Sequence, residues 1–231
     1  MEFQLSDKAR DYIARTKAFI QTEIEPIETA FWQKAHKMNP DGDWTTWQWP
    51  EELAELKAKA KAQHLWNMFI PDDTLGQGLS VQEYAHIAEL SGRSLIAPHV
   101  FNCNAPDSGN MEVLWRYGNE AQKAKWLTPL LAGEIRSVFG MTEPDVASSD
   151  ATNMQATAIV DGDEIVLNGR KWWSSGLGDP NAKLVIFMAH TPDPSKDRHH
   201  QHSMVLVPVD AKGAKIERML KVFNDYDAPH G

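Results

Sequence analysis

The stretch GMTEPDVASSD, residues 140–150, lies where the sequence changes from one pattern to another. Before it, apolar residues recur at helical spacing, and after Ile135 they come in short runs typical of strands. The stretch itself combines the carboxylates of Glu143 and Asp145 with a proline, small residues and hydroxyl groups. A core strand has no use for such residues, so the segment is either a polar turn or part of a ligand site.

The composition is that of an ordinary globular protein. Of 231 residues, 42% are hydrophobic and 24% charged, enough for one large or two small domains. The net charge of -9 argues against nucleic acid or an anionic membrane surface as partner. No apolar run is long enough for a membrane span, and the N-terminus lacks the layout of a secretory signal. The single Cys103 cannot form an internal disulfide, so we expect a cytoplasmic protein.

The first 135 residues predict a helical domain. Tyr12, Phe19 and Ile27 recur at a spacing that places them on one stripe of a helix beginning near Ser6, and Pro26 kinks or ends that helix. A second start signal is the capping box formed by Ser80 with the glutamate three residues later.

The remainder predicts strands. The runs QATAIV, EIVLN and RKWW are joined by the dipeptides Asp161-Gly162 and Asn168-Gly169, which favour tight hairpins. KLVIFMAH, SMVLVPV and AKIERML are further strand candidates. The sequence therefore predicts an α+β protein with an all-α domain at 1–135 and an antiparallel β-barrel or sandwich domain at 136–231.

Two motifs in this order resemble the acyl-CoA dehydrogenase family. The first is Thr142-Glu143-Pro144 leading to Ser149-Asp150, and the second is Lys171-Trp172-Trp173-Ser174-Ser175 after an Asn-Gly turn. The surrounding sequence is similar to the branch whose dehydrogenase domains are sometimes fused to kinase-like domains. One departure stands between Pro144 and Asp150, where the common Gly-Ala-Gly-Ser is replaced by Asp-Val-Ala-Ser-Ser. Substrate length therefore cannot be carried over from the family.

The resemblance implies a flavoprotein oxidoreductase of fatty acid metabolism. Such an enzyme binds FAD, dehydrogenates an acyl-CoA to the 2-enoyl-CoA and passes electrons to an electron-transfer flavoprotein, and it is a homodimer or tetramer. Alternatives are an acyl-CoA oxidase, a flavin monooxygenase, or a non-catalytic fragment that binds a CoA ligand or a partner. VFNDYDAPHG at the end of the sequence resembles a segment inside the β-domain. The family's four-helix domain, which supplies the catalytic base, would then be absent, and we expect the isolated chain to be inactive.

The resemblance also implies roles for particular residues. Phe139, Met141 and Thr142 would lie along the flavin ring edge, Trp173 would cover one ring face, and the Ser175 hydroxyl would approach the reactive flavin nitrogen. Ser149 would contact both the flavin diphosphate and the thioester ligand. The complete set of expected cofactor residues is Phe139, Met141, Thr142, Ser148, Ser149, Trp173, Ser174 and Ser175.

Two other features invite a catalytic or metal-binding interpretation. Glu143 has the chemistry of a base, but we expect it to hydrogen-bond backbone groups within a turn. His199, His200 and His202 form a dense cluster, but no cysteine or spaced carboxylate completes a site, so we expect a polar loop and no metal.

Overall fold

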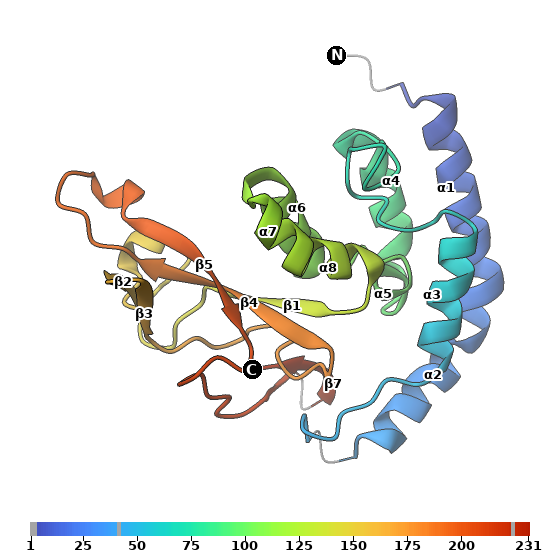
Figure 1. Cartoon of the computed structure of the whole chain (residues 1–231). Coiled ribbons are helices and arrows are strands. Elements are labelled where there is room, and N and C mark those ends of the chain that lie inside the picture. Colours follow the sequence, from blue (N-terminus) through green and yellow to red (C-terminus); the bar gives the residue numbers. More distant parts are fainter. Residues whose placement is uncertain (1–3, 41–42, 223–224) are drawn as a thin grey trace. The chain divides into compact units, whose positions relative to one another are not determined.

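A computed structural model describes residues 4–40, 43–222 and 225–231 (Figure 1). The chain divides into two compact units. Within the described residues, the first unit contains residues 4–40 and Gln48–Gly133. The second unit contains residues 43–47 and Glu134–Gly231. The order of a helical part followed by a β part, predicted from the sequence, is confirmed.

The first unit consists of helices and short helical turns. Their bounds are α1 (Asp7–Phe19), η1 (Ile20–Ile24), α2 (Glu25–Met38), α3 (Glu52–Ala62), α4 (Val81–Ser91), α5 (Ala97–Val100), α6 (Asp107–Tyr117), α7 (Glu120–Gln122), η2 (Lys123–Leu127) and α8 (Thr128–Ala132). The prediction of a first helix beginning near Ser6 is confirmed, since Ser6 is the N-cap of α1. A π-helical turn, η1, follows α1, and Pro26 lies in the first turn of α2. Its stripe is buried at Tyr12 and Phe19 and partly buried at Ile27.

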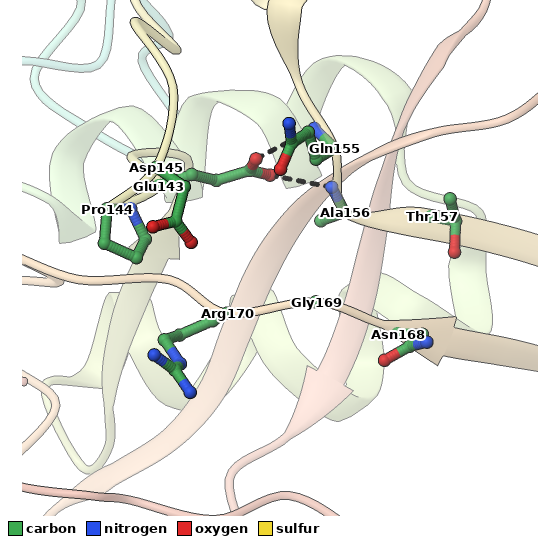
Figure 2. A pocket seen from close by; sticks show the side chains of 9 residues that line it. All are labelled: Glu143, Pro144, Asp145, Gln155, Ala156, Thr157, Asn168, Gly169 and Arg170. Carbon is green, nitrogen blue, oxygen red and sulfur yellow. Dashed lines mark hydrogen bonds between the residues drawn. The ribbon is translucent and has the colours of Figure 1, made fainter.

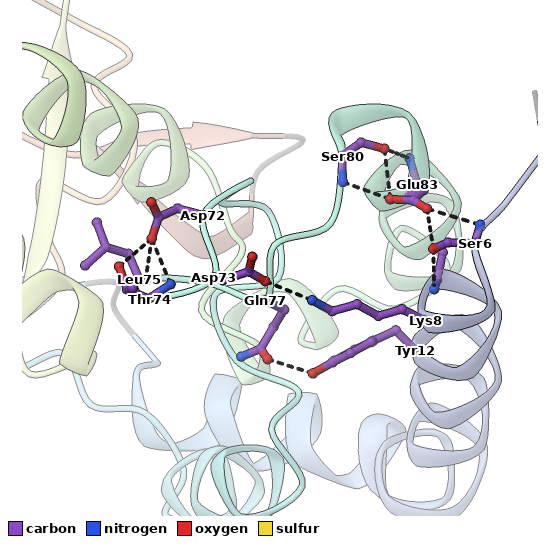
Figure 3. Close-up of polar contacts among 11 residues, drawn as sticks. Ser6, Lys8, Tyr12, Asp72, Asp73, Thr74, Leu75, Gln77, Ser80 and Glu83 are labelled. Atoms are coloured by element: carbon purple, nitrogen blue, oxygen red, sulfur yellow. Dashed lines mark hydrogen bonds and ion pairs between the residues drawn. The ribbon is translucent and has the colours of Figure 1, made fainter.

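One carboxylate connects the starts of two helices in this unit. Glu83 Oε2 accepts hydrogen bonds from the backbone N–H and the hydroxyl of Ser80, which closes the predicted capping box on α4. Its Oε1 accepts from the N–H of Ser6, the N-cap of α1, and contacts the Ser6 hydroxyl at 2.5 Å. Figure 3 shows Glu83 between these two serines. Because four hydrogen bonds, that of the Ser6 hydroxyl foremost, favour the ionised form over the cost of burial, the pKa of Glu83 falls to about 2.

Loop Asp72–Gln77 is tied to the same face of α1. Asp73 Oδ1 lies 2.9 Å from the ammonium of Lys8, and the Tyr12 hydroxyl donates to Gln77 at 2.6 Å. Figure 3 shows both contacts reaching from α1 to the loop. The polar groups around Glu83 and this loop therefore fix the N-terminal half of α1 against α4 and the chain that precedes it.

The second unit contains a mixed sheet of five strands and a small two-stranded sheet. The elements are β1 (Arg136–Gly140), η3 (Ala151–Asn153), β2 (Thr157–Asp161), β3 (Glu164–Asn168), β4 (Ala182–His190), η4 (Arg198–His200), β5 (His202–Pro208), β6 (Leu220–Val222) and β7 (Asp225–His230). The larger sheet has the order β1-β4-β2-β3, and β5 pairs with β4 (Figure 1). The predicted hairpin at Asp161-Gly162 is confirmed, with Gly162 at φ 61°.

The prediction of a wholly antiparallel domain is wrong at β1, and also where Thr157 of β2 pairs in parallel with His190 of β4. The β2–β3 and β4–β5 pairs are antiparallel, but β1 and β4 run parallel along five paired positions. Hairpin dipeptides report only on strands that follow each other directly. A parallel pair requires a crossover of about a dozen residues or more, which the segment between β1 and β4 supplies.

Three local strand predictions also differ from the structure. RKWW forms no strand, and the Asn168-Gly169 dipeptide joins no hairpin, because the chain after β3 runs alongside the 141–150 loop instead of returning. Trp173 has a left-handed backbone at φ 53°, which interrupts any extended run. AKIERML is irregular up to its last residue, where β6 begins. Residues 223–224 of the predicted C-terminal segment lie outside the described residues.

No helix within residues 4–40, 43–222 or 225–231 is both long and apolar enough to span a bilayer.

We expect Glu83→Gln to lower the free energy of unfolding by ~1–2 kcal/mol at pH 7, since both helix caps lose their charged acceptor. Folding lowers the pKa of Glu83 from 4.5 to about 2, so its contribution is present above this interval and is lost as the pH falls through it. Urea unfolding at several pH values checks this. The exposed Glu89→Gln on the same helix is the control and should change little. Equal stability of Glu83→Gln and wild type at pH 7 would contradict the role of Glu83.

Candidate functional site

The loop after β1 is built around a buried glutamate. Glu143 accepts hydrogen bonds from the backbone N–H groups of Gln155 at 2.8 Å and Ala156 at 2.9 Å, and its own N–H donates to Ser148 Oγ at 2.9 Å. Its side chain is 5% exposed. The prediction that Glu143 hydrogen-bonds backbone groups is confirmed, but these groups lie just before β2 and not within the turn, so the side chain connects the loop to β2.

Lys171 pairs with this glutamate. Its ammonium donates to Glu143 Oε1 at 2.8 Å and to the Met141 carbonyl at 2.9 Å, and its side chain is 7% exposed. Burial raises the pKa of Glu143, but the hydrogen bonds from Lys171, Gln155 and Ala156 outweigh it and hold that pKa below its ordinary value. Glu143 is therefore an ionised and fully occupied carboxylate.

The second motif runs directly beside the first. The Trp172 N–H donates to the Thr142 carbonyl at 3.1 Å, so the Lys171 ammonium and the next backbone amide both hold the 141–143 segment. Trp173 follows with φ 53° and 43% of its surface exposed. A left-handed conformation is rare for a bulky residue and costs about 1–2 kcal/mol. The fold thus holds a large aromatic side chain at the surface in an unfavourable backbone state.

The structure sorts the other expected site residues into exposed and buried groups. Thr142 and Ser149 are exposed on the 141–150 loop, while Phe139 at the end of β1 and Met141 after it are partly buried. Ser148 is 2% and Ser174 4% exposed. The Ser148 hydroxyl already accepts the Glu143 N–H.

Ser175 has a partner that the sequence did not indicate. Its Oγ lies 2.9 Å from Nδ1 of His230, at the end of β7, and the backbones of these two residues form an isolated antiparallel bridge. The His230 ring also lies beside Trp173, with centroids 6.3 Å apart. No local pattern could have identified His230, because it lies 55 residues from Ser175 in the sequence.

A polar pocket of about 280 Å³ lies next to Glu143. It is lined by Glu143, Pro144, Asp145, Gln155, Ala156, Thr157, Asn168, Gly169 and Arg170 (Figure 2). In Figure 2, the Glu143 carboxylate points toward the backbone of Gln155 and Ala156. Its oxygens therefore accept hydrogen bonds from the pocket wall. The exposed Asp145 and Arg170 are the charged groups that remain accessible.

Gly169 allows the two walls of this pocket to approach each other. A Cβ at this position would lie 2.4 Å from the Ala156 Cβ, closer than van der Waals contact permits. The Asn168-Gly169 dipeptide thus permits close packing against the residue that donates to Glu143, and not the hairpin that we expected from it.

His199 and His200 lie in η4 within the β4–β5 connection, which confirms the expected polar loop for these two residues. The expectation is wrong for His202, which is the first residue of β5 and is partly buried, with its ring 5.5 Å from that of His190. Hydrogen bonds from Thr152 lower the pKa of Asp150, and the charges of Arg198 and His199 add to the shift. The end of the first motif therefore faces a basic segment. In the described part of the chain, no three His, Cys, Asp or Glu side chains are arranged to hold a metal ion.

Comparison with known proteins identifies the family. The N-terminal domain model of acyl-CoA dehydrogenases matches residues 6–134, and the middle domain model matches residues 138–228. The chain belongs to the acyl-CoA dehydrogenase family. It is 47% identical to acyl-CoA dehydrogenase family member 11 of Gallus gallus, and the match covers 99% of this chain and 29% of that protein. It is 46% identical to probable acyl-CoA dehydrogenase FadE2 of Mycobacterium tuberculosis, over 100% of this chain and 55% of that protein.

Solved acyl-CoA dehydrogenase structures share the fold. A structure from Mycobacterium abscessus, described as an acyl-CoA dehydrogenase, has 55% identity and a TM-score of 0.92, covering 99% of this chain and 57% of its own. A glutaryl-CoA dehydrogenase of Mycobacterium smegmatis in complex with FADH2 has 25% identity and a TM-score of 0.66, covering 90% and 47%. The chain therefore spans roughly a third to a half of the proteins it matches.

The residues of the two motifs fit the chemistry of a flavin. A flavin offers a flat ring with polar edges, and the site presents the exposed indole of Trp173 with the hydroxyls of Thr142 and Ser175 on adjoining segments. The indole N–H of Trp172 is buried and has no hydrogen-bond partner within the described residues.

We expect Lys171→Met to lower the free energy of unfolding by about 3–5 kcal/mol, because it leaves the Glu143 carboxylate buried without its cation. The double variant Glu143→Gln/Lys171→Met removes both charges and should recover a large part of the loss. Urea unfolding of the single and double variants checks this.

Lys215→Met is the matched control, since Lys215 and Glu217 form an ion pair 3.0 Å long with side chains 73% and 62% exposed. It should leave stability unchanged. A Lys171→Met protein as stable as wild type would show that the buried pair does not hold the two motifs together.

Proposed function

We propose that this chain forms the flavin-binding part of an FAD-dependent acyl-CoA dehydrogenase, which converts an acyl-CoA to the 2-enoyl-CoA. The observation that carries the proposal is the pairing of the two motifs. Lys171 and the Trp172 N–H bind the 141–143 segment, and Trp173 stands exposed beside it in a left-handed conformation. Family membership supports the reaction class.

In this proposal each side chain acts through its accessible groups. Trp173 packs against one face of the flavin ring, and Phe139 and Met141 lie along its edge. Thr142 and Ser175 donate hydrogen bonds to polar ring atoms, and Ser149 contacts the diphosphate and the thioester ligand. Ser148 and Ser174 are buried, and the Ser148 hydroxyl and both backbone groups of Ser174 are hydrogen-bonded within the chain, so these serines act by holding the neighbouring residues in place. The bound flavin would supply the acceptor for the hydride from the substrate β-carbon.

The acidic residues of the two motifs do not fit the role of the base that removes the α-proton. Glu143 has a lowered pKa, its carboxylate accepts hydrogen bonds from three groups of the chain, and its side chain is almost completely buried. Asp150 also has a lowered pKa, because its carboxylate accepts from the Thr152 hydroxyl and N–H. A general base works best with a pKa near the working pH, so both carboxylates are too acidic.

The remaining parts of the proposal follow from the family. The electrons pass to an electron-transfer flavoprotein, the substrates are intermediates of fatty acid metabolism, and the complete protein is a homo-oligomer. Its cytoplasmic location is proposed from the single cysteine of the sequence and not from the family. The replaced residues between Pro144 and Asp150 lie on the loop that would face the ligand, so the proposal assigns no length to the acyl chain of the substrate.

Titration of the chain with FAD and with FMN tests the cofactor. We expect weak binding of FAD, no comparable binding of FMN, and about five- to tenfold weaker FAD binding by Trp173→Ala, the loss expected for one aromatic contact. Quenching of flavin fluorescence measures both affinities. Val160→Ala, at an exposed position on β2, is the control and should bind FAD like wild type. Preferential binding of FMN would contradict the proposal.

Anaerobic mixing of the FAD-loaded chain with acyl-CoA tests the absence of a base. We expect no bleaching of the flavin absorbance, because the lowered pKa values of Glu143 and Asp150 make both carboxylates poor acceptors of the α-proton. Dithionite should bleach the same sample, which is the positive control. Bleaching by acyl-CoA would show that a base lies within the chain, and its loss in Glu143→Gln or Asp150→Asn would identify that base.

A further inference from the structure

The backbone of Trp173 needs support on both sides. At φ 53° it lies in a region that a bulky side chain leaves readily unless the neighbouring residues are fixed. Burial does not fix the indole, since 43% of the residue is exposed. Something other than core packing must therefore hold this side chain in place.

The N-terminal side is held by the first motif. The Trp172 N–H donates to the Thr142 carbonyl at 3.1 Å, and the Lys171 ammonium donates to Glu143 and to Met141. Both contacts come from residues that the two motifs already contain.

On the C-terminal side of Trp173, the backbone is held by His230 and Gly231. The Ser174 N–H donates to the Gly231 carbonyl at 2.9 Å, and the Gly231 N–H donates back to the Ser174 carbonyl at 3.2 Å. Ser175 and His230 form the neighbouring bridge and the 2.9 Å contact between Oγ and Nδ1. Two backbone hydrogen bonds and one side-chain bond thus lock the segment after Trp173.

His230 contacts both functional side chains of the second motif. Its ring lies beside the Trp173 indole, 6.3 Å between centroids at an interplanar angle of 59°, while its Nδ1 reaches Ser175. The contact also orients the serine hydroxyl. A protonated Nδ1 donates to Oγ and leaves the hydroxyl hydrogen free for a ligand, whereas an unprotonated Nδ1 accepts that hydrogen.

We propose that His230 is a positioning residue of the flavin site, which holds the Trp173 indole and orients the Ser175 hydroxyl. The proposal rests on the proposed flavin function, but its structural part concerns this chain alone. His230 belongs to neither sequence motif. It comes from β7, so the site is assembled from three separate segments: the loop after β1, the chain at 171–175, and the end of β7.

The first test needs no cofactor. The chain is labelled with 5-fluorotryptophan, and the fluorine resonance of Trp173 is assigned with Trp173→Phe. We expect His230→Leu to shift this resonance. His230→Asn should restore it in part, since the asparagine amide places a hydrogen-bonding atom where His230 has Nδ1 but lacks the ring beside Trp173. The matched control is His200→Leu, because His200 also bonds through Nδ1, to Asp197 at 2.7 Å, but lies exposed in the β4–β5 loop. It should leave the resonance unchanged.

Ser175→Ala removes the same hydrogen bond from the other side and should shift the Trp173 resonance in the same way. It keeps the proposal testable if His230→Leu does not fold. An unshifted Trp173 resonance in folded His230→Leu, or in Ser175→Ala if His230→Leu does not fold, would overturn the proposal.

The second test is FAD affinity. His230→Leu should bind FAD about tenfold more weakly, the size expected from losing one hydrogen bond, and His230→Asn within about twofold of wild type. Equal FAD affinity of His230→Leu and wild type would overturn the role of His230 toward the flavin. If wild type itself binds no FAD, the proposed function fails, and the fluorine resonance alone decides whether His230 positions Trp173.

Discussion

The β unit depends on one requirement, that the carboxylate of Glu143 be neutralised and fully hydrogen-bonded once it is removed from water. An unpaired buried charge costs several kcal/mol, so its partners must be in place whenever the unit is folded. Lys171 and the amides of Gln155 and Ala156 meet this requirement. Because these groups come from the chain after β3 and from the start of β2, satisfying one side chain aligns segments that are distant in the sequence.

This alignment leaves the ligand-facing groups at the surface of a rigid frame. The Glu143–Lys171 ion pair has a structural role, so Glu143 takes no part in the proposed reaction. Trp173 and Thr142 are held at fixed positions beside this pair. The cost of the left-handed Trp173 is offset by hydrogen bonds on both sides of it. Strain of this kind is typical of sites that are organised before a ligand arrives.

The sequence predicted features that depend on near neighbours and missed those that depend on distant ones. The capping box at Ser80 and the turn at Gly162 follow from local hydrogen bonds and backbone freedom, and both are present. The parallel pairing of β1 with β4 and the left-handed Trp173 are set by distant segments, so no local pattern reveals them. The same division holds at the site. Family motifs contain Thr142 and Trp173, whereas His230 becomes visible only through the fold.

The β2–β3 hairpin carries a further consequence for how the molecules behave in concentrated solution. β3 lies at the end of the strand order, and Ile165 and Val166 on it are about half exposed. Such an edge is a template for sheet growth between molecules. The exposed tip holds Asp161, Asp163 and Glu164, whose like charges repel a neighbouring copy at neutral pH. High salt screens that repulsion, so the colloidal stability of the chain depends on three charged residues that take no part in the site.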